Sequence, residues 1–363
     1  MDLRQFIDAC HDDAIVARVS TRNPLARERF MWKTLLFCCG LVLTALLPAA
    51  AAEEKIYRTG LKTESGDFSV SPNGDVLIFT TRKLSHGMRV IDLKTGAIRI
   101  VPSEPKRVLE MARWSRDGKQ LIGVSSGVVD NHYHPGDSQV VLIDPRNWSQ
   151  QTITSGSGVK ADPFLSLDGK TVYYFKGKVR KIGATAASHY ELFALNLADG
   201  REAQLTEESF YQAGHGDFYG DGEIIFAGMG TRQFSNLKGV DGIAEFRIFS
   251  FGLASHQLGL VPINNMGTLF EFSRPKADRN RTLYFQAGTK AQTGPNAYSV
   301  TGRYAYSLLR STSEGAAPVR LAWLPTWATY DIAKCTGDIY VSGERDGELV
   351  FRRLTEVAAP FAN

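Results

Sequence analysis

Three segments of the chain share one pattern of apolar and polar positions. The segments "FSVSPNGDVLIFTT", "ARWSRDGKQLIGVS" and "PFLSLDGKTVYYFK" begin at Phe68, Ala112 and Pro163. Each has a short alternating run, a serine, an Asn-Gly or Asp-Gly pair, and a second run rich in β-branched and aromatic residues. Alternation with period two is typical of half-buried strands. Asn-Gly and Asp-Gly tolerate the positive φ of a tight turn, so each segment predicts a β-hairpin.

Two more strands follow each hairpin, as in "MRVIDLKTGAIRI" and "YELFALNLADGREAQLT", so one unit has four antiparallel strands. Weaker copies continue downstream. The six turns fall 44, 51, 53, 58 and 57 residues apart, at Gly74, Gly118, Gly169, Gly222, Asn280 and Gly337. A period of about 50 residues with four strands per copy is typical of propeller blades. We therefore predict an all-β fold, a six-bladed β-propeller.

The two ends of the repeat array are incomplete. The sixth copy stops after three strands, and "KIYRTGL", from Lys55 to Leu61, precedes the first copy without a partner. We predict that this N-terminal strand becomes the outer strand of the last blade. Such closure leaves no wide sheet edge exposed.

The repeat resembles that of the TolB-like propeller family. The shared features are Ser-x-Asp-Gly-Lys, an aromatic or aliphatic strand, a strand like "YELFALNLADG" and a closing Leu-Thr. The resemblance extends from residue 55 to about residue 355 and is strongest in the third copy. It implies a six-bladed periplasmic propeller but no shared activity. TolB has an α/β domain ahead of its propeller, whereas about a dozen residues separate the expected cleavage site from the first copy here. We therefore expect a free-standing relative of the TolB propeller.

The N-terminal region is typical of an export signal. From Met31, a basic residue leads into an apolar run of 14 residues, Thr34 to Leu47, and then to the small-residue site Ala50-Ala51-Ala52. The run is shorter than the roughly 20 residues that span a bilayer. We expect residues 1–30 to be an extension upstream of the true start, residues 31–52 a signal peptide, and residues 53–363 a single propeller domain. A cytoplasmic tail before an uncleaved anchor is the alternative.

Net charge limits the kinds of partner to expect, and cysteine content limits the possible disulfides. Cleavage after Ala52 removes six basic and five acidic residues, leaving 36 Lys plus Arg against 33 Asp plus Glu. This balance gives no reason to expect nucleic acid or an acidic membrane as a partner. Cys335 is the single cysteine after cleavage, so no intrachain disulfide forms. We expect a periplasmic or secreted monomer with no stable membrane span.

The loops of a propeller separate onto two faces. Turns joining strands one and two, and strands three and four, form what we call the turn face. Loops joining strands two and three, and passages between blades, form the loop-rich face. Five of the six histidines after the signal map to the loop-rich face: His86, His132, His134, His189 and His215. We predict a ligand-binding site there, with Arg232, Trp323 and Trp327 as further members. Solvated loops, and tryptophans packed between blades, are the alternative.

The loop "VVDNHYHPGDS" suggests a metal site on this face. Residues i and i+2 of an extended segment point the same way, so His132 and His134 could both face the channel mouth. Asp130 and Asp137 could complete a mixed site for a divalent metal. No spacing here matches a known metal motif, so solvated or aromatic-packed histidines remain the alternative. We count no cofactor as established.

Catalytic motifs are nearly absent. "GVSSG", residues 123–127, has the spacing of a serine nucleophile but lies at the end of a propeller strand, without the required strand-to-helix elbow. Two functions therefore remain. The favoured one is a module that binds or scaffolds a protein, peptide or envelope glycan through the loop-rich face. The alternative is a metal-assisted lyase or hydrolase of acidic oligosaccharides at the propeller mouth, by analogy of fold with oligogalacturonate lyases.

Overall fold

The computed structural model describes residues 55–62, 65–81, 83, 87–129, 132–179, 187–230, 246–264, 269–278, 280–290, 304–312, 315–325 and 328–354. Residues 1–53 form a separate unit that lies outside these ranges. The predicted upstream extension and signal peptide fall there. No helix long and apolar enough to cross a membrane occurs among the described residues.

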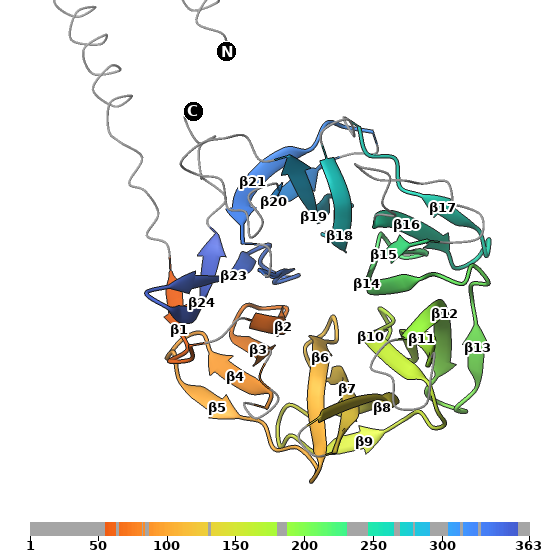
Figure 1. Cartoon of the computed structure of the whole chain (residues 1–363), viewed down its shortest axis with the longest axis horizontal. Helices are drawn as coiled ribbons and strands as arrows, with labels where there is room; N and C mark the ends of the chain where they lie inside the picture. The colour runs from red at the N-terminus through yellow and green to blue at the C-terminus, as the bar shows by residue number, and fades with distance from the viewer. Residues whose placement is uncertain are drawn as a thin grey trace, which may run out of the picture. The chain divides into compact units, whose positions relative to one another are not determined.

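Six four-stranded antiparallel sheets surround a common centre, which confirms the predicted six-bladed propeller (Figure 1). The first blade contains β2 (Ser65–Val70), β3 (Val76–Thr81), β4 (Arg89–Asp92) and β5 (Ile98–Ile100). The second contains β6 (Arg107–Trp114), β7 (Leu121–Val129), β8 (His132–Ile143) and β9 (Gln150–Thr152). The third contains β10 (Val159–Leu165), β11 (Thr171–Val179), β12 (Ala187–Asn196) and β13 (Glu202–Gln204).

The remaining blades repeat this order. The fourth contains β14 (Gln212–Phe218), β15 (Glu223–Met229), β16 (Arg247–Gly252) and β17 (Leu258–Leu260). The fifth contains β18 (Leu269–Ala277), β19 (Leu283–Lys290), β20 (Tyr304–Ser311) and β21 (Val319–Leu324). The sixth contains β22 (Tyr330–Ile332), β23 (Ile339–Arg345), β24 (Glu348–Leu354) and β1 (Ile56–Arg58). The first strand of each blade lies nearest the centre and the fourth lies outermost.

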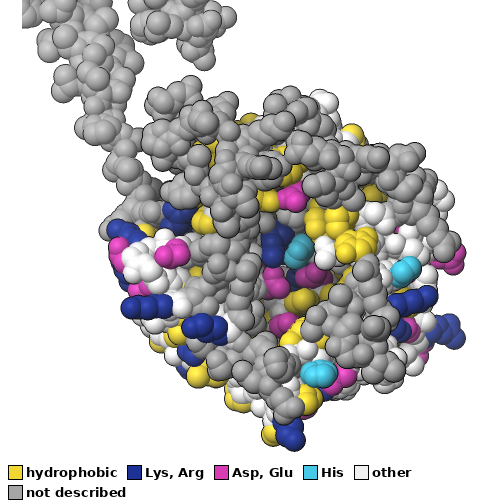
Figure 2. All heavy atoms as spheres, viewed as in Figure 1, with side chains coloured by type: hydrophobic (Ala, Val, Ile, Leu, Met, Phe, Trp, Pro, Cys, Tyr) yellow, Lys and Arg dark blue, Asp and Glu magenta, His cyan; other side chains and the backbone are white. Residues whose placement is uncertain are grey.

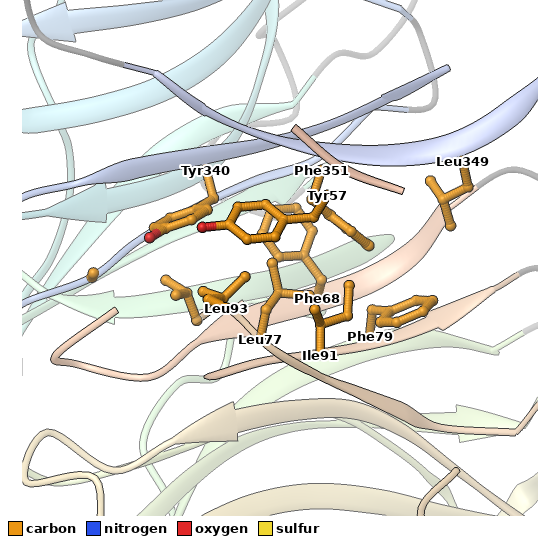
Figure 3. Close-up of a cluster of buried hydrophobic side chains, with 11 residues drawn as sticks. Tyr57, Phe68, Leu77, Phe79, Ile91, Leu93, Tyr340, Leu349 and Phe351 are labelled. Carbon is orange, nitrogen blue, oxygen red and sulfur yellow. The ribbon is translucent and has the colours of Figure 1, made fainter. Parts of the chain in front are cut away.

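The N-terminal strand closes the ring as predicted. β1 pairs with β24 in the register Ile56 with Arg352, and Thr59 Oγ1 donates to the Leu349 carbonyl at 2.8 Å. Tyr57 of β1 is 6% exposed and belongs to a cluster that joins the first and last blades (Figure 3). Within it, the ring centroid of Phe351 lies 5.0 Å from that of Phe68 and 5.0 Å from that of Phe79. Closure therefore buries aromatic surface contributed by both ends of the chain.

The Ser-x-Asp-Gly pattern forms a four-residue loop rather than a two-residue turn. In blade three, Ser166 pairs with Thr171 through the backbone, and Gly169 alone between them has a positive φ, 70°. Ser166 Oγ donates to Asp168 Oδ1 at 2.6 Å and accepts from the Thr171 amide at 2.9 Å. The serine thus closes the loop from within, which explains why it precedes the Asp-Gly pair in each strong copy of the repeat.

Candidate functional site

Five of the six innermost strands contain a register shift, and those in β6, β10, β14 and β18 share a positive φ at the bulge. The strand register shifts between Glu110 and Arg113 in β6, with equivalent shifts in β10, β14 and β18. The first bulged residue has a positive φ in each case: 50° at Met111, 47° at Asp162, 57° at His215 and 51° at Arg274. Non-glycine residues rarely adopt this conformation, and bulges commonly redirect side chains near functional sites.

These bulges build a ring of charged side chains around the propeller axis. We call it the channel belt and define it as Asp67, Arg113, Asp162, His215, Arg274 and Lys276. Together with residues of β2, β6 and β22, the belt encloses a cavity of about 20 Å³ to which all six blades contribute. That is room for about one water molecule. Acidic, basic and histidine side chains are visible together in the hollow at the centre of the ring (Figure 2).

Asp162 lies at the centre of the belt. Its Oδ1 is 3.5 Å from Arg113 Nη2 and 3.5 Å from His215 Nδ1, so the second, third and fourth blades meet at one carboxylate. Burial acts to raise the pKa of Asp162, but His215, Arg113 and Arg274 together hold this pKa well below its usual range. The carboxylate is therefore ionised and paired.

The other belt residues also bridge blades. Arg274 Nη1 of blade five is 2.9 Å from Asp67 Oδ1 of blade one, and Tyr330 Oη of blade six donates to the Arg274 carbonyl. Arg113 of blade two donates to the Gly216 carbonyl of blade four. Because these contacts join separate sheets, the belt connects the inner ends of the blades.

A second cavity lies on the axis next to the belt, toward the turn face. This turn-side cavity has a volume of about 130 Å³, and every blade contributes to its lining. Lys276 Nζ is 3.0 Å from Asp331 Oδ1, and Lys334 Nζ is 2.6 Å from Asp217 Oδ2. Burial lowers the pKa of Lys276, although Asp331 opposes this effect. Lys276 contacts both this cavity and the belt.

Glu110 occupies the inner strand of blade two one residue before Met111. Its Oε1 accepts hydrogen bonds from Ser126 Oγ at 2.8 Å and from Tyr133 Oη. Burial raises the pKa of Glu110 to about 7, against the effect of these two hydrogen bonds. The tyrosine between the two histidines of "DNHYH" therefore reaches inward to the wall of the channel.

A larger concavity lies beside the third blade. This blade-three groove has a volume of about 710 Å³, and its lining includes Lys176, Lys178, His189, Glu191, Phe193 and Gln204. Lys176 Nζ is 2.8 Å from Glu202 Oε1 and 5.0 Å from the centroid of the Phe193 ring. Glu191 accepts hydrogen bonds from Thr206 Oγ1 at 2.7 Å and from the Ser209 amide at 2.6 Å. Because Val179 ends β11 and Ala187 begins β12, the groove opens on the loop-rich face.

The predicted histidines that the structure describes lie in separate parts of the propeller. His215 lies within β14, in the channel belt rather than in a loop. His189 lines the blade-three groove, and Ser188 Oγ is 2.9 Å from its Nδ1. His134 is exposed on β8, opposite Gly127. The described residues therefore place one of these histidines on the axis and another in a lateral groove.

The metal prediction is only partly within the described residues. Asp137 accepts a hydrogen bond from the Gly127 amide at 2.9 Å and lies 3.6 Å from Arg107 Nη1. His86, Asp130, Arg232, Trp327 and the side chain of His132 fall outside the described part of the chain. Among described residues, no three or more His, Cys, Asp or Glu side chains form a group that could hold a metal ion. The proposed four-residue site stays a prediction.

Trp323 is the one predicted tryptophan that the structure describes. It lies half-buried on β21, with its backbone paired to Ser307. The Arg320 guanidinium carbon lies 3.8 Å from the centre of its ring. One face of this indole is therefore already covered by a cation, so a sugar could stack only on the other.

The channel belt was missed by the sequence reasoning, except for His215. A signal did exist: "KADPFL" and "SRPKA" place a charged residue directly before proline inside an otherwise apolar strand. Proline is confined to edges and bulges within sheets, so these pairs mark bulges in strands that repeat position assigns to the centre. The side chain of the charged residue before each proline is then expected to point toward the propeller axis.

Comparisons with known proteins agree with this architecture. No protein-family model and no curated protein sequence matches the chain. A putative TolB from Agrobacterium tumefaciens is 12% identical with a TM-score of 0.53, over 83% of this chain and 97% of that one. TolB from Acinetobacter baumannii is 12% identical with a TM-score of 0.50, over 81% and 64%.

An oligogalacturonate lyase in complex with manganese has a lower TM-score, 0.48, with 11% identity over 81% of this chain and 78% of that one. Identities this low show the fold alone. The repeat, the six sheets, the closing strand and the two TolB structures together lead to one conclusion. The chain is a β-propeller with the TolB-like six-bladed fold.

Proposed function

We propose that this protein is an exported, periplasmic binding module that holds a protein, peptide or envelope glycan against its loop-rich face. The observation that carries the proposal is the blade-three groove of about 710 Å³, which opens on that face and includes the predicted residue His189. A concave site of this size is typical of ligand pockets.

The lining of the groove suits a polar polymer. It combines the ammonium group of Lys178 and the paired ammonium group of Lys176 with the amide of Gln204, the hydroxyl of Ser209, the carboxylate of Glu207 and the ring of Phe193. Glu191 is buried and bonded to its own blade, so it stabilises the wall instead of facing a ligand. An extended chain with hydrogen-bonding groups and some negative charge fits these walls best.

The rest of the ring supports a binding role through rigidity. The belt connects neighbouring and distant blades by ion pairs, as between Arg274 and Asp67. A rigid frame keeps mobile or variable loops at fixed separations, which lowers the entropic cost of holding a ligand across them. The TolB-like fold and the export signal expected from the sequence support the periplasmic location.

In-cell photocrosslinking tests this proposal. A photoreactive residue replaces Lys178 in the groove, and a control replaces Lys119, whose side chain is 81% exposed on the turn face. We expect irradiation to attach one defined protein, peptide or glycan at position 178 and none of it at position 119. Equal products at both positions, or products only at 119, would contradict the proposal. Unsaturated products from oligogalacturonate incubated with the purified protein and manganese would instead favour the lyase.

A further inference from the structure

We propose that the turn-side cavity is a second binding site, which takes a carboxylate attached to a short, branched apolar group. The site lies on the propeller axis at the turn face and is separate from the blade-three groove. The inference does not depend on the proposed function, because no residue lines both cavities.

Apolar and charged residues line the turn-side cavity in similar number. Val70, Leu165, Ile332 and Ala277 line it, each at most 7% exposed, and Phe218 of blade four adds an aromatic ring. The apolar part of this lining favours an apolar body, because water finds few hydrogen-bonding partners beside it. The charged groups come from blade two, with Arg113 and Arg116, and from blades four, five and six.

Both lysine ammonium groups in this lining have N–H bonds without an acceptor among the described residues. An ammonium group has three N–H bonds. Within the described residues, Lys276 Nζ has one partner, Asp331, while Lys334 Nζ has two, Asp217 and the Ala277 carbonyl. Three donor positions therefore remain for a ligand. The indole Nε1 of Trp114, which also lines the cavity, is buried without an acceptor in the described structure.

Four acids line the cavity, and each already has a partner of its own. Asp221, whose side chain is 93% exposed, has its Oδ1 3.8 Å from Arg116 Nη1, and Asp278 Oδ1 accepts from the Asn280 and Thr282 amides. Asp331 Oδ2 accepts from the Val70 amide at 2.9 Å while Oδ1 meets Lys276. Asp217 Oδ2 accepts from both the Ala277 amide, at 3.1 Å, and Lys334. Arg113 adds a further positive charge at the cavity wall. A ligand carboxylate would accept hydrogen bonds from the remaining N–H donors of these buried cations. Hydrogen bonds between charged groups are strongest in such a desolvated environment.

The volume limits the size of the ligand. A cavity near 150 Å³ holds benzene, so about 130 Å³ accommodates roughly six non-hydrogen atoms. Isobutyrate has six non-hydrogen atoms, and the C-terminal valine of a peptide has seven when its Cα, side chain and carboxylate are counted. Both sources share one chemistry. The belt closes the inner end of the cavity, so the rest of a peptide would extend out through the turn face.

Ligand-observed NMR titration of the purified protein tests the site. The probes are isobutyrate, its neutral isostere isobutyramide, and the tripeptide Gly-Gly-Val with a free or an amidated C-terminus. We expect isobutyrate to bind at least tenfold more tightly than isobutyramide, and the free tripeptide at least tenfold more tightly than its amide. Binding of isobutyrate but not the tripeptide would identify a free acid as the ligand. Equal affinity for acid and amide, or no binding of either acid, would overturn the proposal.

A paired substitution locates the binding. Lys276→Met with Asp331→Asn removes both charges while the asparagine oxygen can still accept from the Val70 amide, so no buried charge is left alone. The control makes the same changes in an outer pair of the turn face, Lys94→Met with Asp75→Asn, whose charged atoms are 3.0 Å apart. We expect at least a tenfold loss of isobutyrate affinity in the first variant and none in the control. Equal affinity in both variants would place the site elsewhere. If the first variant fails to fold, the comparison of acid and amide probes on the wild-type protein still tests the proposal.

Discussion

Two buried carboxylates of the channel wall, those of Asp162 and Glu110, differ in the direction of their pKa shifts. Asp162 is buried among cations, which keep its pKa well below the usual range. Glu110, on the inner strand of the neighbouring blade, is enclosed beside two hydroxyl groups, and burial raises its pKa to about 7. Two carboxylates in one wall therefore take opposite protonation states in mildly acidic solution.

The raised pKa of Glu110 makes stability depend on pH. In the folded protein the group binds its proton up to about pH 7, whereas its ordinary pKa is 4.5. The folded state therefore holds more protons between these values, and stability falls as pH rises through this window, by about 3 kcal/mol as an order of magnitude.

Glu110→Gln should remove this pH dependence, because a neutral amide oxygen can still accept from Ser126 and Tyr133. We expect the variant to exceed the wild-type free energy of unfolding at pH 8 and to match it at pH 5. Urea unfolding across this range measures the difference. Glu271→Gln is the control, because Glu271 also accepts from a tyrosine, Tyr306. Parallel curves for wild type and Glu110→Gln would contradict the assignment.

At the scale of the element, the hairpin loops depend on their serine. In blade three the Ser166 hydroxyl serves three groups: Asp168 Oδ1 at 2.6 Å, the Lys170 amide at 3.1 Å and the Thr171 amide at 2.9 Å. The equivalent serine in blade two, Ser115, donates to Asp117 Oδ1 at 2.7 Å and accepts from the Gln120 amide at 3.0 Å. The repeated serine is thus a structural residue of the turn face.

Ser166→Ala should lower the free energy of unfolding by about 1–2 kcal/mol, since it leaves the Thr171 amide without its acceptor and Asp168 without its hydroxyl donor. The Lys170 amide still donates to Asp168 Oδ1 at 3.1 Å. Ser149→Ala is the control, because Ser149 is exposed in another hairpin loop. It should change stability by less than about 0.5 kcal/mol. Chemical denaturation midpoints compare the two variants, and similar shifts would argue against a special role for Ser166.

At the scale of the whole molecule, stability depends on joining the two ends of the chain. The closing blade takes three strands from the C-terminal end and β1 from the N-terminal end. Tyr57 fixes β1 to a core cluster that also contains Phe68 and Phe351. Without β1 the ring would lose this contact and expose the edge of β24.

Deletion of residues 55–61 should therefore lower the melting temperature sharply and promote association through the free edge of β24. Tyr57→Ala isolates the packing contribution, for which we expect a loss of about 3–5 kcal/mol. Arg58→Ala is the control, because the Arg58 side chain is 48% exposed and its ion pairs contribute little. Thermal melts and size-exclusion chromatography measure these effects. An unchanged melt after the deletion would show that β1 is dispensable for closure.

The fold was predictable from the sequence because its determinants are local. Turn residues such as Gly118 and Gly169 mark each hairpin, and their spacing gives the blade number. The channel belt was not predictable, because its members come from five strands that are distant in the sequence and meet only in the folded ring. Arg113 donates to the carbonyl of Gly216, 103 residues later, and no pattern within either blade encodes that contact. The alternation of apolar and polar residues along a strand is also interrupted at a bulge, because the extra residue changes which side chains face each side of the sheet.

The belt cavity of about 20 Å³ has a consequence for a molecule held in the turn-side cavity. A space of this volume holds about one water molecule and is too small for isobutyrate. A ligand of that size would therefore leave the turn-side cavity toward the turn face and not through the belt.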